Sequence, residues 1–269
     1  MKIRQSAAAG LGLVAALAFA VAGCTDTAGS PTVNQTATPS ATGSSDTGSA
    51  EAATALAQAA AKLSESSFKL TTTAGPANSV TGVMDPPRKL GQTTLNTTVQ
   101  NTTVTIESVM TGEDVYLKIS GLPEGLSSKW LHVDVNRLSP DSQLGFTPGE
   151  FDPASTERLL KSAGNVQRMG DNGFVGTLDL TKVAGVATLG NKAVVSLGNE
   201  ATKVPFEATT DDQGRLVAMK INMPAAAGQP ARTIDTRYSD FGTPVTIQSP
   251  PAAEIVEAPD LVYKMVGGR

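Results

Sequence analysis

Reactive side chains are scarce in this sequence, which has a single cysteine, Cys24, and a single histidine, His132. One cysteine cannot form an internal disulfide, so a folded domain of this chain must be stabilised by its hydrophobic core. Metal sites made of histidine and cysteine are excluded as well, and the acidic pairs Glu113-Asp114 and Asp211-Asp212 fall in predicted turns, where such residues are common. We expect neither a metal ion nor another cofactor.

Positive charge is also in short supply. The chain has 21 Lys and Arg residues against 25 Asp and Glu residues, a net charge of −4 at pH 7, and the basic residues are scattered. Phe, Trp and Tyr together make up 4% of the sequence. Proteins that bind nucleic acid need a basic surface, often with aromatic side chains on which bases stack. The composition therefore argues against nucleic acid as a partner.

The surroundings of Cys24 are typical of a lipoprotein signal. Lys2 and Arg4 precede an apolar run, residues 7–22, and small residues lead to Cys24. This order of basic, apolar and small residues predicts a signal peptide that is cut just before Cys24, whose thiol then carries lipid, with palmitate among the expected chains. Each buried methylene adds about 0.8 kcal/mol of membrane affinity, so two or three acyl chains anchor a protein firmly. A transmembrane helix is the alternative, but the glycines in the run and the polar residues after it favour cleavage.

Composition divides the remaining chain into segments. Residues 1–23 are the predicted signal peptide, and 24–50, rich in Ser, Thr, Gly, Ala and Pro, form a predicted disordered tether. Residues 51–250 carry the folded domain, and 251–269 a Pro- and Ala-rich tail that we expect to lie on the surface. The predicted cleavage removes Lys2 and Arg4 but no acidic residue, so the net charge of the mature chain becomes −6.

Periodicity predicts one helix followed by many strands. Apolar residues recur every three or four positions over residues 50–66, with Ser49 as the expected N-cap, and the period changes to two after Phe68. A second helix is expected after Asp152, with Leu159 and Leu160 facing inward, and residues 181–189 fit either a helix or a loop. The predicted strands start near Phe68 and continue at 79–84, 89–97, 102–110, 114–120, 129–135, 165–171, 173–180, 203–210, 214–223, 232–241 and 243–248.

Short connections between these strands predict antiparallel pairing, as at Asn172-Gly173 and Thr111-Gly112-Glu113. About ten strands with two or three helices between groups of them indicate an α+β fold. We expect a single curved antiparallel β-sheet with helices packed on its concave side.

Catalytic chemistry has little support in the sequence. His132 lies in the middle of a predicted strand, where Trp130 and Asp134 share its face. His132 and Asp134 could form a base and its orienting group, but side chains two apart on a strand seldom bond, and no G-x-S-x-G motif supplies a nucleophile. A polar outward face is the simpler interpretation, and we expect no enzyme activity.

The apolar faces of the strands remain as the candidate functional feature. With few aromatic residues to fill the space between sheet and helices, a cavity could persist there, whereas alternating strands also build closely packed cores. Both readings stay open from the residues alone. The apolar residues concerned are Val104, Ile106, Val115, Leu117, Ile119, Leu131, Val133, Phe174 and Leu178.

The chain resembles the LppX/LprAFG family of actinobacterial (mycobacterial-type) lipoproteins. The resemblance lies in the motif ending at Cys24, the Ser/Thr-rich tether, and an Ala-rich helix followed by Ser66-Ser67-Phe68-Lys69-Leu70. It continues in Phe151-Asp152-Pro153-Ala154 before a helix, and in the run from Gly214 to Tyr238 and on to Gln248. The resemblance covers about residues 56–250, without a catalytic motif.

This resemblance implies a LolA/LppX-like half-barrel that binds acylated glycolipids or phospholipids between the sheet and its helices. The nine apolar residues above would then line the lipid cavity, and the protein would carry or present lipids in the cell envelope, with an envelope lipid transporter as a further partner. It would be anchored by lipid to the extracytoplasmic face of the cell membrane. A closed-core lipoprotein acting as a scaffold or transporter accessory is the alternative, and a hydrolase using His132 is a third class.

Overall fold

The computed structural model describes residues 44–99, 102–121, 129–138, 152, 155–183, 191–226 and 230–266. The chain divides into two units, Met1–Ala41 and Thr42–Arg269, and every described element belongs to the second. Both hydrophobic clusters lie in that unit, so it has its own core and is expected to fold independently. Cys24, the predicted signal peptide and the tether up to residue 43 lie outside the described residues.

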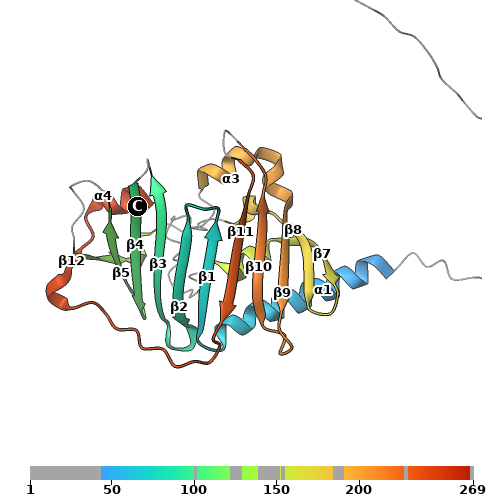
Figure 1. The fold of residues 1–269 in the computed structure, drawn as a ribbon, viewed down its shortest axis with the longest axis horizontal. Coiled ribbons are helices and arrows are strands. Elements are labelled where there is room, and N and C mark those ends of the chain that lie inside the picture. The colour runs from blue at the N-terminus through green and yellow to red at the C-terminus, as the bar shows by residue number, and fades with distance from the viewer. Residues whose placement is uncertain are drawn as a thin grey trace, which may run out of the picture. The chain divides into compact units, whose positions relative to one another are not determined.

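A single open sheet holds all twelve described strands, in the order β12-β6-β5-β4-β3-β2-β1-β11-β10-β9-β8-β7 (Figure 1). Together with the helices, this sheet confirms the predicted α+β class. The strands are β1 (Phe68–Ala74), β2 (Ser79–Asp85), β3 (Leu90–Val99), β4 (Thr102–Thr111), β5 (Asp114–Ser120), β6 (Trp130–Asp134), β7 (Ala163–Met169), β8 (Gly173–Leu178), β9 (Val204–Thr210), β10 (Leu216–Met223), β11 (Arg232–Ser239) and β12 (Ile255–Glu257).

Pairing in the sheet is antiparallel except at one edge. β12 runs parallel to β6, so the sheet is mixed and the prediction of a purely antiparallel sheet is wrong there. Hairpins such as β4–β5 formed as predicted, with Gly112 at φ 72°, a left-handed conformation that glycine adopts without strain. The sheet is continuous because β1 pairs with β11, which lies far along the chain.

Strand alternation gives the sheet two distinct faces. On β1 and β9 every second residue is buried, beginning with Phe68 and Val204, and the residues between them are exposed. Cross-strand pairs carry this division through the sheet, since directly opposed residues point to the same side. We call the side of Phe68 and Phe206 the inner face and the other side the outer face.

The helices α1 (Ser44–Ala61) and α2 (Thr156–Lys161) contact each other, and α1 also contacts β7 and β10. In Figure 1, α1 passes behind the strands at the β7 end of the sheet. The apolar stripe of α1 is buried as its spacing predicted, and it consists of Ala52, Leu56, Ala59 and Ala60, followed by Leu63 in η1 (Lys62–Ser64). The helix begins at Ser44, within the segment assigned to the tether, so Ser49 is not its N-cap.

The second helix begins at Thr156, after Asp152 as expected. Ser155 occupies the N-cap position, while the Asp152 carboxylate accepts hydrogen bonds from the backbone N–H groups of Thr156 (3.0 Å) and Arg158 (3.1 Å). Both predicted inward residues, Leu159 and Leu160, are buried. A carboxylate at a helix start satisfies N–H groups that have no partner within the helix.

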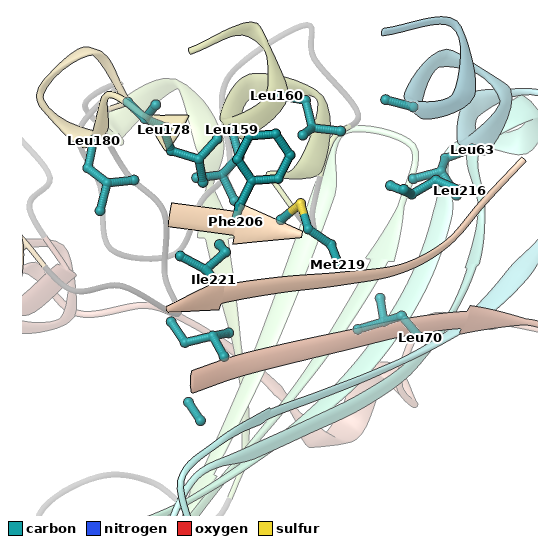
Figure 2. Packing of buried hydrophobic residues seen from close by; sticks show 14 of the residues in the cluster. Leu63, Leu70, Leu159, Leu160, Leu178, Leu180, Phe206, Leu216, Met219 and Ile221 are labelled. Carbon is teal, nitrogen blue, oxygen red and sulfur yellow. The ribbon is translucent and has the colours of Figure 1, made fainter. Parts of the chain in front are cut away.

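The core between α1, α2 and the inner face is closely packed. Figure 2 shows Phe206 from β9 and Met219 from β10 pointing toward Leu159 and Leu160 of α2. Gly176 on β8 pairs with Phe206, and a Cβ atom at Gly176 would lie 2.8 Å from the Phe206 ring. The absent side chain thus leaves the space that the aromatic ring fills.

The chain after residue 242 differs from its prediction. Residues 243–248 were expected to form a strand, yet residues 243–250 have no regular structure. The tail then forms the short helix η6 (Ala252–Glu254), strand β12 and helix α4 (Asp260–Val266), none of which was predicted. Strand β12 has three residues, too few for alternation to be recognised, and its pairing with β6 is a tertiary contact.

The remaining described elements are helix α3 (Asn191–Leu197) and the short helices η2 (Pro86–Arg88), η3 (Val135–Arg137), η4 (Leu180–Lys182) and η5 (Gly198–Lys203).

Candidate functional site

All nine predicted lining residues lie on the inner face, but on two separate parts of the sheet. Seven come from β4, β5 and β6, where cross-strand pairs such as Val115 with Val133 and Leu117 with Leu131 join them. Phe174 and Leu178 lie on β8, near the other edge of the sheet. Six of the nine belong to the main core cluster: Val115, Leu117, Leu131, Val133, Phe174 and Leu178.

Burial separates these residues into two groups. Leu117 is 2% exposed and Val133 and Leu178 are 0% exposed, whereas Ile106 and Ile119 are half-buried. A side chain beside a void large enough for water keeps accessible surface, so fully buried side chains are in contact with neighbours on all sides. The buried residues thus pack in this structure as a core does, and their role in lining a lipid cavity stays a prediction.

A continuous row of half-buried apolar side chains crosses the inner face. Val80 of β2 pairs with Leu95 of β3, Leu95 with Ile106 of β4, and Ile106 with Ile119 of β5. All four are half-buried. At a strand spacing of about 4.8 Å, the row is roughly 14 Å long. We call these four residues the apolar row, an accessible apolar feature of the described inner face.

Hydroxyl groups on neighbouring positions of the inner face bond to one another. Thr72, opposite Val80 on β1, shares a 2.9 Å hydrogen bond with Thr236 of β11. Beside the Leu95–Ile106 pair, at the next inner-face position of β3 and β4, the hydroxyls of Thr93 and Ser108 bond to each other. These pairs satisfy one another inside the sheet, so the apolar row is flanked by polar groups that already have partners.

A buried polar network fixes α2 on β11. The hydroxyls of Thr156 and Tyr238 lie 2.6 Å apart, and Asp152 accepts the two backbone hydrogen bonds described above. Burial raises the pKa of Asp152 and also that of Tyr238 above their usual values. Both shifts therefore have a structural cause, the position of these groups beneath a helix.

His132 lies on the outer face between two carboxylates. Its Nε2 is 2.9 Å from Asp114 Oδ1 on β5, and its Nδ1 is 3.0 Å from Glu257 Oε1 on β12. The hydrogen bond with Glu257 is the largest contribution that raises the pKa of His132, and the bond with Asp114 adds to it, while partial burial lowers it. Asp134 is not a partner of His132, in line with the argument against that pair, and its carboxylate accepts from the backbone N–H of Asn136. Both ring nitrogens thus bond to carboxylates, and these two bonds link β6 to β5 and to β12.

The outer face carries a shallow hollow of about 310 Å³ over β1, β2 and β3. Its lining includes three threonines and a glutamine, and its one cation, Lys69, forms a 2.7 Å ion pair with Asp240. No set of directed, unsatisfied polar groups is evident among these lining residues. The lining residues are Lys69, Leu70, Thr71, Thr81, Gly82, Val83, Gln92, Thr94 and Ser239.

Within the described ranges, no group of histidine, cysteine, aspartate or glutamate side chains could hold a metal ion. Nor does any helix in those ranges have the length and apolar character needed to cross a membrane.

Sequence reasoning missed Val80 and Leu95, half of the apolar row. Val80 sits in a strand interrupted by Gly82, and Leu95 in a run of threonines, so neither stands out by local hydrophobicity. Register reveals them, because each is opposite an apolar residue on the next strand. Alternation along β3 places Leu95 on one face with Thr93 and Thr97. Its pairing with Ile106 depends on how the strands come together in the tertiary structure.

A comparison with protein-family models and a comparison with curated proteins found no match to this chain.

Proposed function

We propose that this protein is a membrane-anchored lipoprotein that binds acylated lipids, glycolipids or phospholipids, against the inner face of its sheet and carries or presents them in the cell envelope. The apolar row is the observation that supports this proposal. Four half-buried aliphatic side chains in one line offer an acyl chain a continuous apolar surface roughly 14 Å long. Each methylene transferred from water contributes about 0.8 kcal/mol.

The LolA/LppX-like half-barrel implied by the sequence resemblance fits this proposal. A single open sheet with helices on one face is the architecture that such a carrier needs. Binding would be by desolvation alone, with the headgroup left at the rim and no covalent step. Lipidation of Cys24 would keep the domain near the extracytoplasmic face of the cell membrane, where an envelope lipid transporter could deliver or accept the cargo.

A closed-core scaffold or transporter accessory is the second candidate function. It is favoured by the close packing of Leu117, Leu131 and Val133, which leaves these side chains almost without accessible surface. The two functions differ in what they require. A carrier must admit a ligand into or beside this core, whereas a scaffold must not.

Lipid extraction after native mass spectrometry tests the choice between them. We would purify the Thr42–Arg269 unit, offer it a diacyl phospholipid and an acylated glycolipid, and weigh the complex. A stoichiometric bound lipid supports the carrier and names its cargo class, whereas an unchanged protein mass with both lipids supports the scaffold.

A matched pair of variants tests where the lipid binds. Ile106→Trp puts a large ring into the apolar row and is expected to reduce lipid uptake severalfold. Thr81→Trp adds the same side chain at an exposed position of the outer face and should leave uptake unchanged. Equal uptake by both variants would show that lipid binds elsewhere.

Substitution of the anchoring residue tests the membrane part of the proposal. Cys24→Ser removes the thiol to which the diacylglyceryl group would be attached. The full-length variant should move from the membrane fraction to the soluble fraction after cell lysis, or remain as the uncleaved precursor.

A further inference from the structure

The C-terminal segment wraps around one edge of the sheet. We call residues 243–266 the C-terminal strap, and in Figure 1 it is the red-orange segment that leads from β11 to β12 and α4. Its first part packs on the outer face, where Val245 and Ile247 form the second hydrophobic cluster with strand residues. The other members of this cluster are Ile255 of β12 and, from the strands before the strap, Val83, Leu90, Val109, Tyr116 and Trp130.

The second part of the strap belongs to the inner core. Ala258, Val262 and Tyr263 are buried in the same cluster as Leu131 and Val133 of β6. The Tyr263 side chain is 1% exposed, and its hydroxyl accepts a 2.9 Å hydrogen bond from the backbone N–H of Asp134. The strap therefore covers the β6 end of the core in which most of the predicted lining residues pack.

Several polar contacts hold the strap, and they respond differently to pH. Arg88 donates to the carbonyl of Val245 (2.8 Å), and Arg137 forms a 2.6 Å ion pair with Asp260 while its guanidinium lies 3.8 Å from the centre of the Tyr263 ring. Arginine and aspartate keep their charges throughout the neutral range. His132, which bonds to Glu257 of the strap, is the group among these whose ordinary titration range is near neutral pH.

The groups that face His132 come from three strands. β5 supplies Asp114 and the ring of Tyr116, whose centre is 5.2 Å from that of the imidazole, and β12 supplies Glu257. Asp134 lies on the same face of β6, and Lys118 of β5 lies over the Trp130 ring at 5.7 Å. Two of the carboxylates contact the imidazole directly, and the ring can donate to both only in its protonated form.

We propose that the C-terminal strap is a pH-sensitive closure of the inner core, held shut in part by the Asp114–His132–Glu257 bridge and loosened when His132 loses its proton. This inference rests on the proposed lipid-binding function, whose site it regulates. A neutral imidazole has one N–H, so one of the two carboxylates then faces a ring nitrogen that cannot donate. The strap is expected to hold at mildly acidic pH and to loosen as the pH rises. Loosening of β12 and α4 would uncover Leu131 and Val133 and give an acyl chain access beside the apolar row.

The single tryptophan makes the closure measurable. Trp130 pairs with Ile255 of the strap and packs in the outer-face cluster. We would record its emission in the Thr42–Arg269 unit from pH 5.5 to 9. A shift of the emission maximum to longer wavelength as the pH rises, reversible on acidification, is the expected result. An emission maximum that stays constant over this range would overturn the proposal.

Variants assign the transition to the bridge. His132→Gln should abolish the pH dependence, and Glu257→Gln should move the midpoint to lower pH, because it removes the largest contribution that raises the pKa of His132. Asp134→Asn is the matched control, since Asp134 shares the face but is bonded to Asn136 instead, and it should keep the midpoint of the unmodified protein. Glu257→Gln still tests the assignment if His132→Gln fails to fold. A wild-type midpoint in Glu257→Gln would contradict the proposal.

Lipid uptake separates the closure from the proposed function. The probe is phosphatidylglycerol with a fluorescent acyl chain, offered in vesicles at pH 6 and pH 8.5. Faster uptake at pH 8.5, lost in His132→Gln, supports the closure. Uptake at equal rates at both pH values, with the Trp130 transition intact, overturns the closure but leaves the carrier function standing. No uptake at either pH, with the transition intact, removes the carrier function and the closure role with it.

Discussion

Two parts of the inner face are built from similar strands yet differ in packing. Between β8 and β11, the inner positions are closed by α1 and α2, and Phe206 and Leu216 are at most 1% exposed. Between β2 and β5, the apolar row remains half-buried. The alternation is the same in both parts, and among the described elements α1 and α2 pack on the first of them. Apolar residues on a strand therefore identify a face, and the covering elements decide whether that face becomes core or surface.

The largest effect is expected from truncation within the covered part. Phe206→Ala removes a ring that contacts α2 and Gly176, and it should lower the free energy of unfolding by about 3–5 kcal/mol. Ile106→Ala in the apolar row should cost about 1 kcal/mol, since a half-buried side chain loses only part of its transfer free energy. Urea unfolding of both variants measures the difference. Equal losses would show that side chains in the two parts of the inner face are packed equally closely.

A second test adds volume instead of removing it. Leu117 and Ile106 are both predicted lining residues on adjacent strands, but Leu117 is 2% exposed and Ile106 is half-buried. Leu117→Trp should destabilise the fold by about 1–3 kcal/mol through overpacking, and Ile106→Trp should cost less than about 1 kcal/mol. Thermal unfolding followed by circular dichroism compares them. If Leu117→Trp is tolerated as well as Ile106→Trp, Leu117 faces open space in solution.

A hydrogen bond of the strap offers a test with a smaller expected effect. Tyr263→Phe keeps the ring in the core but deletes the hydroxyl that accepts from the Asp134 backbone N–H. The expected loss is about 1–2 kcal/mol, because the N–H is left without its partner. Urea unfolding should give this loss at pH 6 and a smaller one at pH 8.5, where the proposed closure has loosened α4. An equal loss at both pH values would show that α4 stays in place when His132 is neutral.

The smallest effect is the pH dependence of stability itself. The pKa of His132 is raised in the folded state, so its stabilising contribution is fully present below the unfolded value of 6.5 and is lost as the pH rises through the folded value. Because Asp114 and Glu257 are largely exposed, we expect a loss of about 0.5–1 kcal/mol. His132→Gln should remove this dependence while leaving that of the remaining groups. If the unmodified protein is instead more stable at high pH, the pH dependence has the opposite sign and the bridge is not its cause.

Most strands and the faces of their residues could be read from the sequence. β5 was predicted with its observed bounds, and Leu131 and Val133 face opposite to Trp130 and His132 as expected. Local rules suffice there, since alternation and turn residues act over a few positions. They failed for residues 243–248, where an apolar alternation resembles a strand but Val245 and Ile247 instead pack across the outer face without pairing.

The candidate site was predictable only in part. The sequence singled out Ile106 and Ile119, but not Val80 and Leu95, because a row across four strands depends on register. It placed His132 on a polar outward face, as observed, but could not identify its partners, Asp114 and Glu257. Glu257 is separated from His132 by 125 residues, so no local pattern could have joined them.

By itself, the sequence determined the class of the fold, the inner and outer side of strands such as β1, β5 and β6, the inward stripe of α1 and the prediction of a lipid anchor at Cys24. These follow from periodicity and composition, which act along the chain. The tertiary structure decided that β1 joins β11, that the C-terminal strap closes the β6 edge and that His132 bridges three strands. Such features depend on contacts between residues far apart in the chain, whose free energies become favourable only when the whole sheet has formed.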